Sequence, residues 1–494
     1  MIGFRLIYIS FFCFLLNSIA AQKQDYIAFD DKVSYCYQQI IELDFLEAKK
    51  TLSGLSIPRK NKIRILLENY NDFFKLFIHE NRSYYDKVKP QKNIRLEQIQ
   101  NSTLTQEWKN YLQAEIHLQW ALVHLKMEDN FLAFQSIRQA LSLLESNQKE
   151  YPEFKYTYKS LGILHALVST IPEGFTWAAK IIGLRGTLQE GIKELDLFLQ
   201  FAESENPLFI QEAIAAKSFL MAYLENKPNE AYQYLSNKIV VLDPNPLMTF
   251  IHSRIAMKAG YNDATINIIS SLPPSSRQKL PFLSYLHGVA ALQKLDLKAE
   301  QYFLQYLKDF KGNSYIKEAY QKLSWCALMN KQNLNYERYK QLCLTKGNTL
   351  TDEDQQALKE AQKNELPNLF LLKARLLSDG NYPKDAERLL LENEKVILAE
   401  STYRLEYYYR LGRVYQLLKV KDKAKLNFKL VVDQDLTQKS FMSANALLQC
   451  GYIYESEQNH SMAKKYYKSV LERNPDQYSR SLHQKAKAGL VRIK

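Results

Sequence analysis

The residues that could carry out chemistry in this chain are few and scattered. Eight histidines occur among 494 residues, and the pair closest to a metal-ligand arrangement is His117 and His124, with Glu115 nearby. Seven residues are two helical turns, about 10.5 Å along the axis. That separation is too long for both imidazoles to reach one ion without a ligand from another helix. We therefore expect these histidines to pack in a core, and we expect neither a metal site nor a cofactor.

Catalytic motifs are missing from the sequence as well. It contains no phosphate loop of the G-x-x-x-x-G-K type, no G-x-S-x-G, no H-E-x-x-H and no C-x-x-C. The run Asp352, Glu353 and Asp354 directly follows Thr351, a pattern that suits the start of a helix because acidic side chains favour its positive end. We expect a protein that is not an enzyme. The alternative is an activity on envelope polymers, since superhelical helical domains also occur in enzymes that cut peptidoglycan.

The elements that must position these residues are helices. Only 15 glycines and 14 prolines interrupt the chain, and hydrophobic residues make up 46% of it. The mean hydropathy of -0.36 is typical of a water-exposed globular chain. No convincing stretch alternates between apolar and polar residues as a strand would. The composition therefore predicts an all-α protein.

The N-terminus predicts export. One positive residue, Arg5, precedes an apolar stretch over residues 6–16, and small residues follow up to Ala20 and Ala21. Eleven helical residues span about 16 Å, well short of the roughly 30 Å bilayer core. The pattern is typical of a secretory signal peptide over residues 1–21; the alternatives are an uncleaved anchor or a buried N-terminal helix. We expect a periplasmic or outer-membrane-associated protein.

Cysteines and charge add little about function. After residue 21 the cysteines are Cys36, Cys326, Cys343 and Cys450, which imply no disulfide framework, although their spacing leaves a Cys326–Cys343 bond open. The formal net charge is +13, and residues 401–494 hold 18 Lys and Arg against 8 Asp and Glu. This region is either the solvated face of helices or a surface that attracts an acidic protein or anionic envelope lipid. We expect no nucleic acid partner because the chain is predicted to be exported.

Two segments near the C-terminus repeat one spacing. Counting from residue 405, the positions 4, 7, 8, 11, 20 and 24 hold Tyr408, Leu411, Gly412, Tyr415, Ala424 and Phe428. Counting from residue 444, the positions 4, 8, 11, 20, 24 and 32 hold Leu447, Gly451, Tyr454, Ala463, Tyr467 and Pro475. Small residues at positions 8 and 20 allow two antiparallel helices to approach, and large residues fill the space around them.

This pattern resembles the tetratricopeptide repeat. A weaker copy puts Ala386 at position 20, and further turn-then-alanine patterns continue upstream. The resemblance implies a tetratricopeptide-type α-solenoid of antiparallel helix pairs. We expect an N-terminal helical domain at residues 22–200, degenerate helical pairs at 201–345 and a C-terminal array at 346–494.

The resemblance also implies a binding groove along the first helix of each repeat. Groove positions 2, 5, 9, 12 and 13 correspond to Glu406, Tyr409, Arg413, Gln416 and Leu417 in one repeat, and to Asn445, Leu448, Tyr452, Glu455 and Ser456 in the next. Arg375 takes position 9 of the preceding repeat. We expect Arg375, Arg413 and Tyr452 to lie on successive helices and to grip a carboxylate and an extended peptide. The alternative is that the arginines pair with acidic neighbours.

Residues 161–195 differ from this background because they concentrate glycines around Pro172 and Trp177. The spacing is similar to a stretch in a eukaryotic tetratricopeptide family that includes mitochondrial outer-membrane proteins linked to inclusion-body clearance. We interpret this segment as a joint that redirects two helices rather than as a ligand site.

The sequence as a whole predicts an exported scaffold that binds a protein or peptide partner in the cell envelope. The alternative, from another class, is a carrier or processing factor for envelope glycan or lipid that docks on an anionic surface through the basic C-terminal region.

Overall fold

The computed structural model describes residues 24–54, 57–169, 185–205, 208–239, 245–363, 366–475 and 477–493. Every regular element in these ranges is a helix, and one isolated bridge joins Tyr26 and Asn61. The predicted all-α fold of antiparallel, tetratricopeptide-type helix pairs is confirmed for this part of the chain. None of its helices combines the length and the apolar character needed to cross a membrane. The predicted signal peptide lies outside the described residues.

The chain divides into two compact units. The first consists of Met1–Ile255, Leu272–Pro281 and Phe310–Gly312, and the second of Ala256–Ser271, Phe282–Asp309 and Asn313–Lys494. The boundaries expected after residues 200 and 345 stay predictions, because compactness alone does not define a functional domain.

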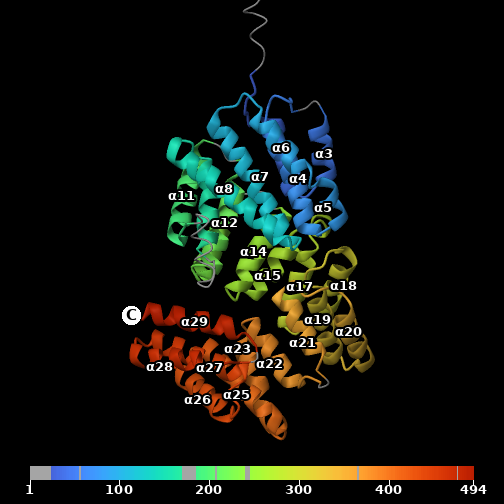
Figure 1. The fold of residues 1–494 in the computed structure, drawn as a ribbon. Helices are drawn as coiled ribbons and strands as arrows, with labels where there is room; N and C mark the ends of the chain where they lie inside the picture. Colours follow the sequence, from blue (N-terminus) through green and yellow to red (C-terminus); the bar gives the residue numbers. More distant parts are fainter. Residues whose placement is uncertain are drawn as a thin grey trace, which may run out of the picture. The chain divides into compact units, whose positions relative to one another are not determined.

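The first unit is built from helices between residues 31 and 278, many of them labelled in Figure 1. They are α2 (Asp31–Ile41), α3 (Phe45–Ser53), α4 (Ile63–His79), α5 (Arg82–Val88), α6 (Gln91–Gln100), α7 (Gln106–Lys126), α8 (Asn130–Glu150), α9 (Thr157–Val168), α11 (Leu188–Ser204), α12 (Ile210–Tyr223), α13 (Pro228–Ile239), most of α14 (Pro246–Lys258) and α16 (Pro274–Gln278).

The second unit contains the helices of the array predicted at residues 346–494 and several helices that precede it. They are α15 (Asn262–Ser271), α17 (Phe282–Gln293), α18 (Ala299–Asp309), α19 (Ile316–Met329), α20 (Asn333–Thr345), α21 (Asp352–Ala361), α22 (Leu369–Asp379), α23 (Pro383–Glu392), α24 (Glu394–Leu398), the short 3-10 helix η1 (Ser401–Tyr403), α25 (Arg404–Leu417), α26 (Lys421–Gln434), α27 (Phe441–Ser456), α28 (His460–Leu471) and α29 (Ser479–Arg492).

Local chemistry explains where several of these helices begin. Thr351 caps α21 by accepting the backbone N–H of Asp354, and acidic residues fill the first turn, as predicted. The Asp354 carboxylate in turn accepts the backbone N–H groups of Tyr315 at 2.6 Å and Glu318 at 3.0 Å. This buried carboxylate therefore ties the starts of α19 and α21 together.

Backbone conformation repeats along the second unit. Five turns between paired helices pass through a residue other than glycine with left-handed backbone: Leu295, Lys331, Asn381, Lys419 and Gln458. The last three are 38 and 39 residues apart, the same intervals that separate the position-20 alanines. The repeat in the sequence is therefore also a repeat in the path of the chain.

Small residues lie where the paired helices cross. A Cβ atom on Gly412 would lie 2.7 Å from the Phe428 ring, and one on Gly451 would lie 2.5 Å from the Tyr467 ring. Each aromatic ring thus rests directly on the backbone of the opposite helix.

The other predicted packing residues lie around these crossings. Ala424 and Ala463 are fully buried, and Tyr415 is 6% exposed. Tyr454 is half-buried and stacks on Tyr466 with the ring centroids 5.3 Å apart, and Pro475 is buried after the end of α28.

Two glycines bring α9 and α11 into backbone contact in the first unit. A Cβ atom on Gly162 would lie 2.6 Å from the Gly191 carbonyl oxygen, and one on Gly191 would lie 2.4 Å from the Gly162 carbonyl oxygen. A Thr187–Glu190 capping box begins α11. The glycines expected to redirect two helices therefore form a close helix crossing. Residues 170–184 of this segment, with Pro172 and Trp177, lie outside the described part of the chain.

A buried charge network joins five helices of the first unit. The Lys159 ammonium on α9 lies 3.1 Å from the Glu115 carboxylate and 2.6 Å from the Glu212 carboxylate. Tyr37 and Tyr70 donate hydroxyl hydrogen bonds to Glu212 at 2.5 and 2.8 Å. The two carboxylates keep Lys159 charged and raise its pKa, although burial alone would lower it. Removal of Lys159 would take away the cation that the Glu115 and Glu212 carboxylates share.

All four described cysteines are buried free thiols: Cys36, Cys326, Cys343 and Cys450. The Cys326–Cys343 bond left open by the sequence is not formed. Burial raises the pKa of each thiol to about 12, so these cysteines are poor nucleophiles in the folded protein.

The α9–α11 crossing gives a stability prediction. Gly191→Ala places a methyl group against backbone atoms of Gly162 and Ala166, which cannot rotate away. We expect the variant to lose about 1–3 kcal/mol of unfolding free energy from overpacking, although alanine favours a helix over glycine by about 1 kcal/mol. Urea unfolding measures the change. Gln200→Ala on the exposed side of α11 is the matched control and should be nearly neutral; an equally stable Gly191→Ala variant would contradict the close crossing.

Candidate binding site

The candidate site lies in the second unit, on the first helices of successive hairpins. α22, α25 and α27 each pair with the helix that follows, and α29 packs against α27 and α28. Since Gly412 and Gly451 fix how α25 and α27 sit on their partners, the opposite faces of α25 and α27 are also fixed. Polar side chains from all four helices converge on these faces.

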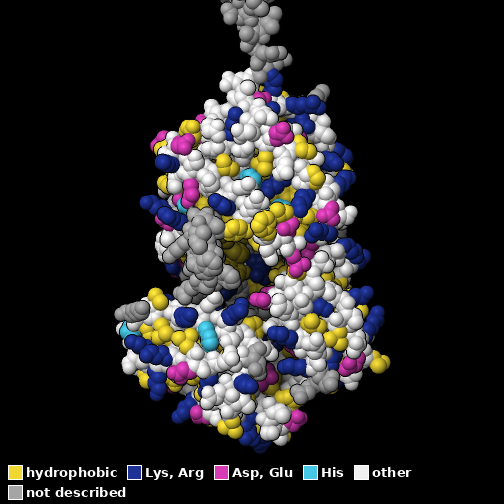
Figure 2. Space-filling model, in the orientation of Figure 1, with side chains coloured by type: hydrophobic (Ala, Val, Ile, Leu, Met, Phe, Trp, Pro, Cys, Tyr) yellow, Lys and Arg dark blue, Asp and Glu magenta, His cyan; other side chains and the backbone are white. Residues whose placement is uncertain are grey.

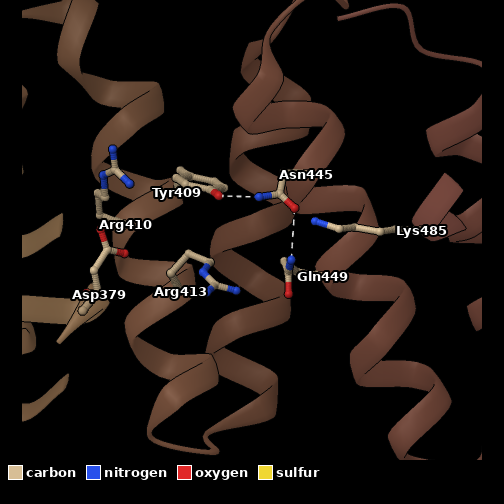
Figure 3. A pocket seen from close by; sticks show the side chains of 8 residues that line it. Asp379, Tyr409, Arg410, Arg413, Asn445, Gln449 and Lys485 are labelled. Carbon is tan, nitrogen blue, oxygen red and sulfur yellow. Dashed lines mark hydrogen bonds between the residues drawn. The ribbon is translucent and has the colours of Figure 1, made fainter. Parts of the chain in front are cut away.

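These side chains line a cavity of about 260 Å³, drawn in Figure 3. Its lining is formed by Ser378, Asp379, Tyr409, Arg410, Arg413, Asn445, Gln449 and Lys485. Arg413 and Lys485 point toward Asn445 and Gln449 from opposite sides. The lining is strongly polar and holds three cations against one carboxylate.

Amide side chains form a hydrogen-bonded row through the cavity. The Asn445 amide donates to the Tyr409 hydroxyl at 2.6 Å, and the Gln449 amide donates to Asn445 at 3.0 Å. Gln416 donates to Gln449 at 2.9 Å and accepts from Arg413 at 2.8 Å. Each amide is held in a fixed orientation by its neighbours, so the row presents a preorganised polar surface to a ligand.

The three cations of the cavity differ in whether an acidic side chain pairs with them. Arg410 donates two hydrogen bonds, at 3.0 and 2.7 Å, to one oxygen of Glu406. Arg413 donates to the neutral Gln416 and forms no salt bridge within the described residues. Burial lowers the pKa of Lys485, and the nearby charges of Lys258 and Arg413 lower it further. The cavity therefore has an excess of positive charge that an anionic group would relieve.

A second cavity of about 850 Å³ shares Asp379, Tyr409 and Arg410 with the first. Its lining mixes apolar side chains such as Leu371 and Phe441 with acidic and basic ones. The shared residues make the two cavities neighbouring parts of one groove.

The structure places the predicted groove residues in the first cavity, in the second cavity or outside both. Tyr409 and Arg413 line the first cavity, and Gln416 belongs to its hydrogen-bonded row. Arg375 lines the second cavity, where its guanidinium lies over the Trp325 ring and approaches Glu360 at 4.0 Å and Asp379 at 3.8 Å. Arg375 thus has the acidic neighbours that the alternative interpretation expected.

Five other predicted groove positions line neither cavity: Leu417, Leu448, Tyr452, Glu455 and Ser456. Tyr452 packs edge-on against Tyr467 and lies beneath the Arg492 guanidinium. Leu448 is buried in the core of the array. The sequence reasoning missed Arg410, Gln449 and Lys485, because the repeat register names neither the neighbouring positions that also reach the groove nor the terminal helix α29.

His124 and Glu115 on α7 interact with other parts of the first unit. His124 is hydrogen-bonded to the Tyr85 hydroxyl at 2.9 Å, and Glu115 belongs to the Lys159 network. Throughout the described ranges, no group of three His, Cys, Asp or Glu side chains is arranged to hold a metal ion.

Basic side chains on the C-terminal helices are dispersed. On the face seen in Figure 2, Lys and Arg over α28 and α29 alternate with apolar and uncharged side chains. This view shows a mixed surface there rather than one continuous basic patch.

Comparison with known proteins gives no family. No family model and no curated protein matches the sequence. Among solved structures, the human IFIT1 dimer with PPP-AAAA is 14% identical over 92% of this chain and 99% of its own, with a TM-score of 0.36. The P58(IPK) TPR domain is 16% identical over 87% and 99%, with a TM-score of 0.23, and Naa15/Naa10 bound to HypK-THB is 14% identical over 93% and 66%, with a TM-score of 0.24. At these identities and TM-scores, the similarity shows no function for this chain. The tetratricopeptide-like architecture is inferred from the helix packing described above.

The buried histidines of the first unit predict a dependence on pH. Burial lowers the pKa of His117 from 6.5 to about 3, with a further contribution from Lys92. The unfolded chain therefore binds a proton below pH 6.5 that the folded chain excludes. The folded state loses stability as the pH falls from 6.5 toward 3, by about 1.4 kcal/mol per pH unit for this residue.

Urea unfolding at pH 7 and pH 5 tests this prediction. In His117→Gln, the stability lost between the two pH values should be smaller than in the unaltered protein by about 2 kcal/mol. The matched control is His460→Gln, at an exposed position, which should retain the full pH dependence. The same pH dependence in all three proteins would contradict the burial of a neutral imidazole at position 117.

Proposed function

We propose that this protein is a binding scaffold whose C-terminal array holds an extended peptide, with an acidic group of that peptide in the cavity between Arg413 and Lys485. One observation carries the proposal: two cations, neither of which forms an ion pair within the described residues, face a preorganised row of amides. Helix pairs of the tetratricopeptide type leave such a groove open along their first helices.

The chemistry of the groove favours a peptide. Fixed amides such as Asn445 and Gln449 offer donors and acceptors that match a peptide backbone. A forked guanidinium and an ammonium on either side recognise a carboxylate. The neighbouring cavity, with Leu371 and Phe441, provides apolar surface for adjoining side chains.

Export belongs to the proposal. The apolar stretch over residues 6–16 and the small residues at Ala20 and Ala21 support cleavage of a signal peptide and a role in the cell envelope. N-terminal sequencing of the protein from its native cells should find a chain beginning near residue 21 or 22. An intact Met1 on cytoplasmic protein would contradict export.

Peptide selection tests the binding site. Peptides selected on the protein from a random synthetic library with amidated C-termini should share an acidic residue. In Arg413→Gln and in Lys485→Gln, the Kd of the best peptide should rise at least about tenfold, equivalent to roughly 1.4 kcal/mol. The helicity and the melting temperature should stay unchanged.

The control is Lys464→Gln, an exposed position on α28 that lines neither cavity. Its Kd should equal that of the unaltered protein. Selected peptides without acidic residues, or equal affinity in all variants, would overturn the proposal. An RNA oligonucleotide or a glycan that binds in an Arg413-dependent way where no peptide does would favour another class of partner.

A further inference from the structure

We infer that the terminal helix α29 is a ligand-coupled part of the site: an anion bound between Arg413 and Lys485 holds α29 against the array, and docked α29 in turn strengthens anion binding. This inference rests on the proposed function, since it concerns the same cavity. It adds that α29 completes the site and that α29 can dock on the array or leave it.

α29 packs on the array through one apolar face, with Leu490 and Ile493 partly buried beside its core residues. Its buried residues are Leu482, Ala486 and Gly489. Gly489 lies directly on the Tyr467 ring, since a Cβ atom there would be 2.5 Å from it. Its main packing partners among the described helices are α27 and α28. A helix with so little buried apolar surface gains only a modest docking free energy.

One ion pair positions the far end of α29. The Arg492 guanidinium donates to both oxygens of Glu455 on α27, at 2.7 and 2.8 Å, and lies over the Tyr452 ring. The Glu455 carboxylate also accepts a hydrogen bond from the Tyr467 hydroxyl. Arg492 lines neither cavity, so it affects the site only through the position of α29.

Charge in the cavity opposes the docked position. Lys485 lies on α29 next to the buried Ala486, and its ammonium enters the cavity toward Arg413. The nearby Arg413 and Lys258 charges disfavour a further cation there. Without a bound anion, docking of α29 brings the Lys485 ammonium toward the like charge of Arg413. With an anion between Arg413 and Lys485, the same approach becomes attractive.

Thermodynamic linkage makes the effect reciprocal. A ligand that binds the docked state better than the undocked state shifts the chain toward docking. Any change that favours docking must raise ligand affinity by the same factor. The coupling can therefore be measured in two ways: as the effect of ligand on the docking of α29, or as the effect of docking on ligand affinity.

Hydrogen exchange of the full chain tests the inference, with sulfate as a probe that does not depend on finding the peptide. At constant ionic strength, replacing chloride with sulfate should slow exchange over residues 479–492 by about fivefold or more. Hydrogen exchange in the helices of the first unit serves as the reference for the general effect of sulfate on stability. In Lys485→Gln, exchange of α29 should no longer respond specifically to sulfate, and in sulfate-free buffer α29 should be at least as protected as in the unaltered protein.

Arg492→Gln separates positioning from ligand contact. This variant should speed α29 exchange and weaken binding of the selected acidic peptide by about fivefold. Arg480→Gln, an exposed position at the other end of α29, is the matched control and should change neither. High concentrations of peptide should restore α29 protection in Arg492→Gln and should leave α29 protection unchanged in Lys485→Gln.

The outcomes distinguish the two proposals. If the acidic peptide binds through both Arg413 and Lys485 but α29 exchange responds to neither peptide nor sulfate, the coupling is wrong and the binding site stands. If sulfate protects α29 through Lys485 but no peptide binds, the coupling stands and the peptide-binding function is wrong. If neither sulfate nor peptide acts through Lys485, both are overturned.

Discussion

Contact between a small residue on one helix and an aromatic ring on its partner is the constraint on which the C-terminal array depends. Gly412 receives the Phe428 ring and Gly451 receives the Tyr467 ring, at distances that leave no room for a side chain. A close crossing fixes both the separation and the rotation of two helices, because side chains of fixed volume must fill the remaining space. Once this face is fixed, the opposite face of the first helix is fixed as well.

The polar cavity follows from this arrangement. Arg413 directly follows Gly412 in the sequence, and Gln449 lies two residues before Gly451, so the packing residues and the groove residues alternate along the same helices. Tyr467 extends the arrangement to the end of the chain, because its ring touches Gly489 of α29 as well as Gly451. One ring thus connects the last hairpin with the helix that carries Lys485.

The helix pairs and their small-residue crossings could be predicted from the sequence because they depend on local spacing. Gly412 and Ala424 stand 12 residues apart in one repeat, and Gly451 and Ala463 are 12 apart in the next. The groove was predictable only in part. Arg413 is where the register placed it, whereas Tyr452 is drawn onto Tyr467 and beneath Arg492, an interaction that comes from a helix outside the repeat.

The first unit carries the features that spacing did not reveal. The two carboxylates that pair with Lys159 lie 44 and 53 residues away in the sequence, so no local pattern predicts a buried lysine. The Gly162–Gly191 crossing was anticipated only as a change of helix direction, since glycine alone does not identify which backbone approaches it. Long-range contacts of this kind require the three-dimensional arrangement.

The most direct test of the central claim is a crystal structure of the protein with a selected acidic peptide. The account predicts that a peptide carboxylate lies within hydrogen-bond distance of both the Arg413 guanidinium and the Lys485 ammonium, with the peptide backbone on Asn445. A peptide bound on another surface, with the Arg413–Gln416 hydrogen bond and the cavity unchanged, would contradict it.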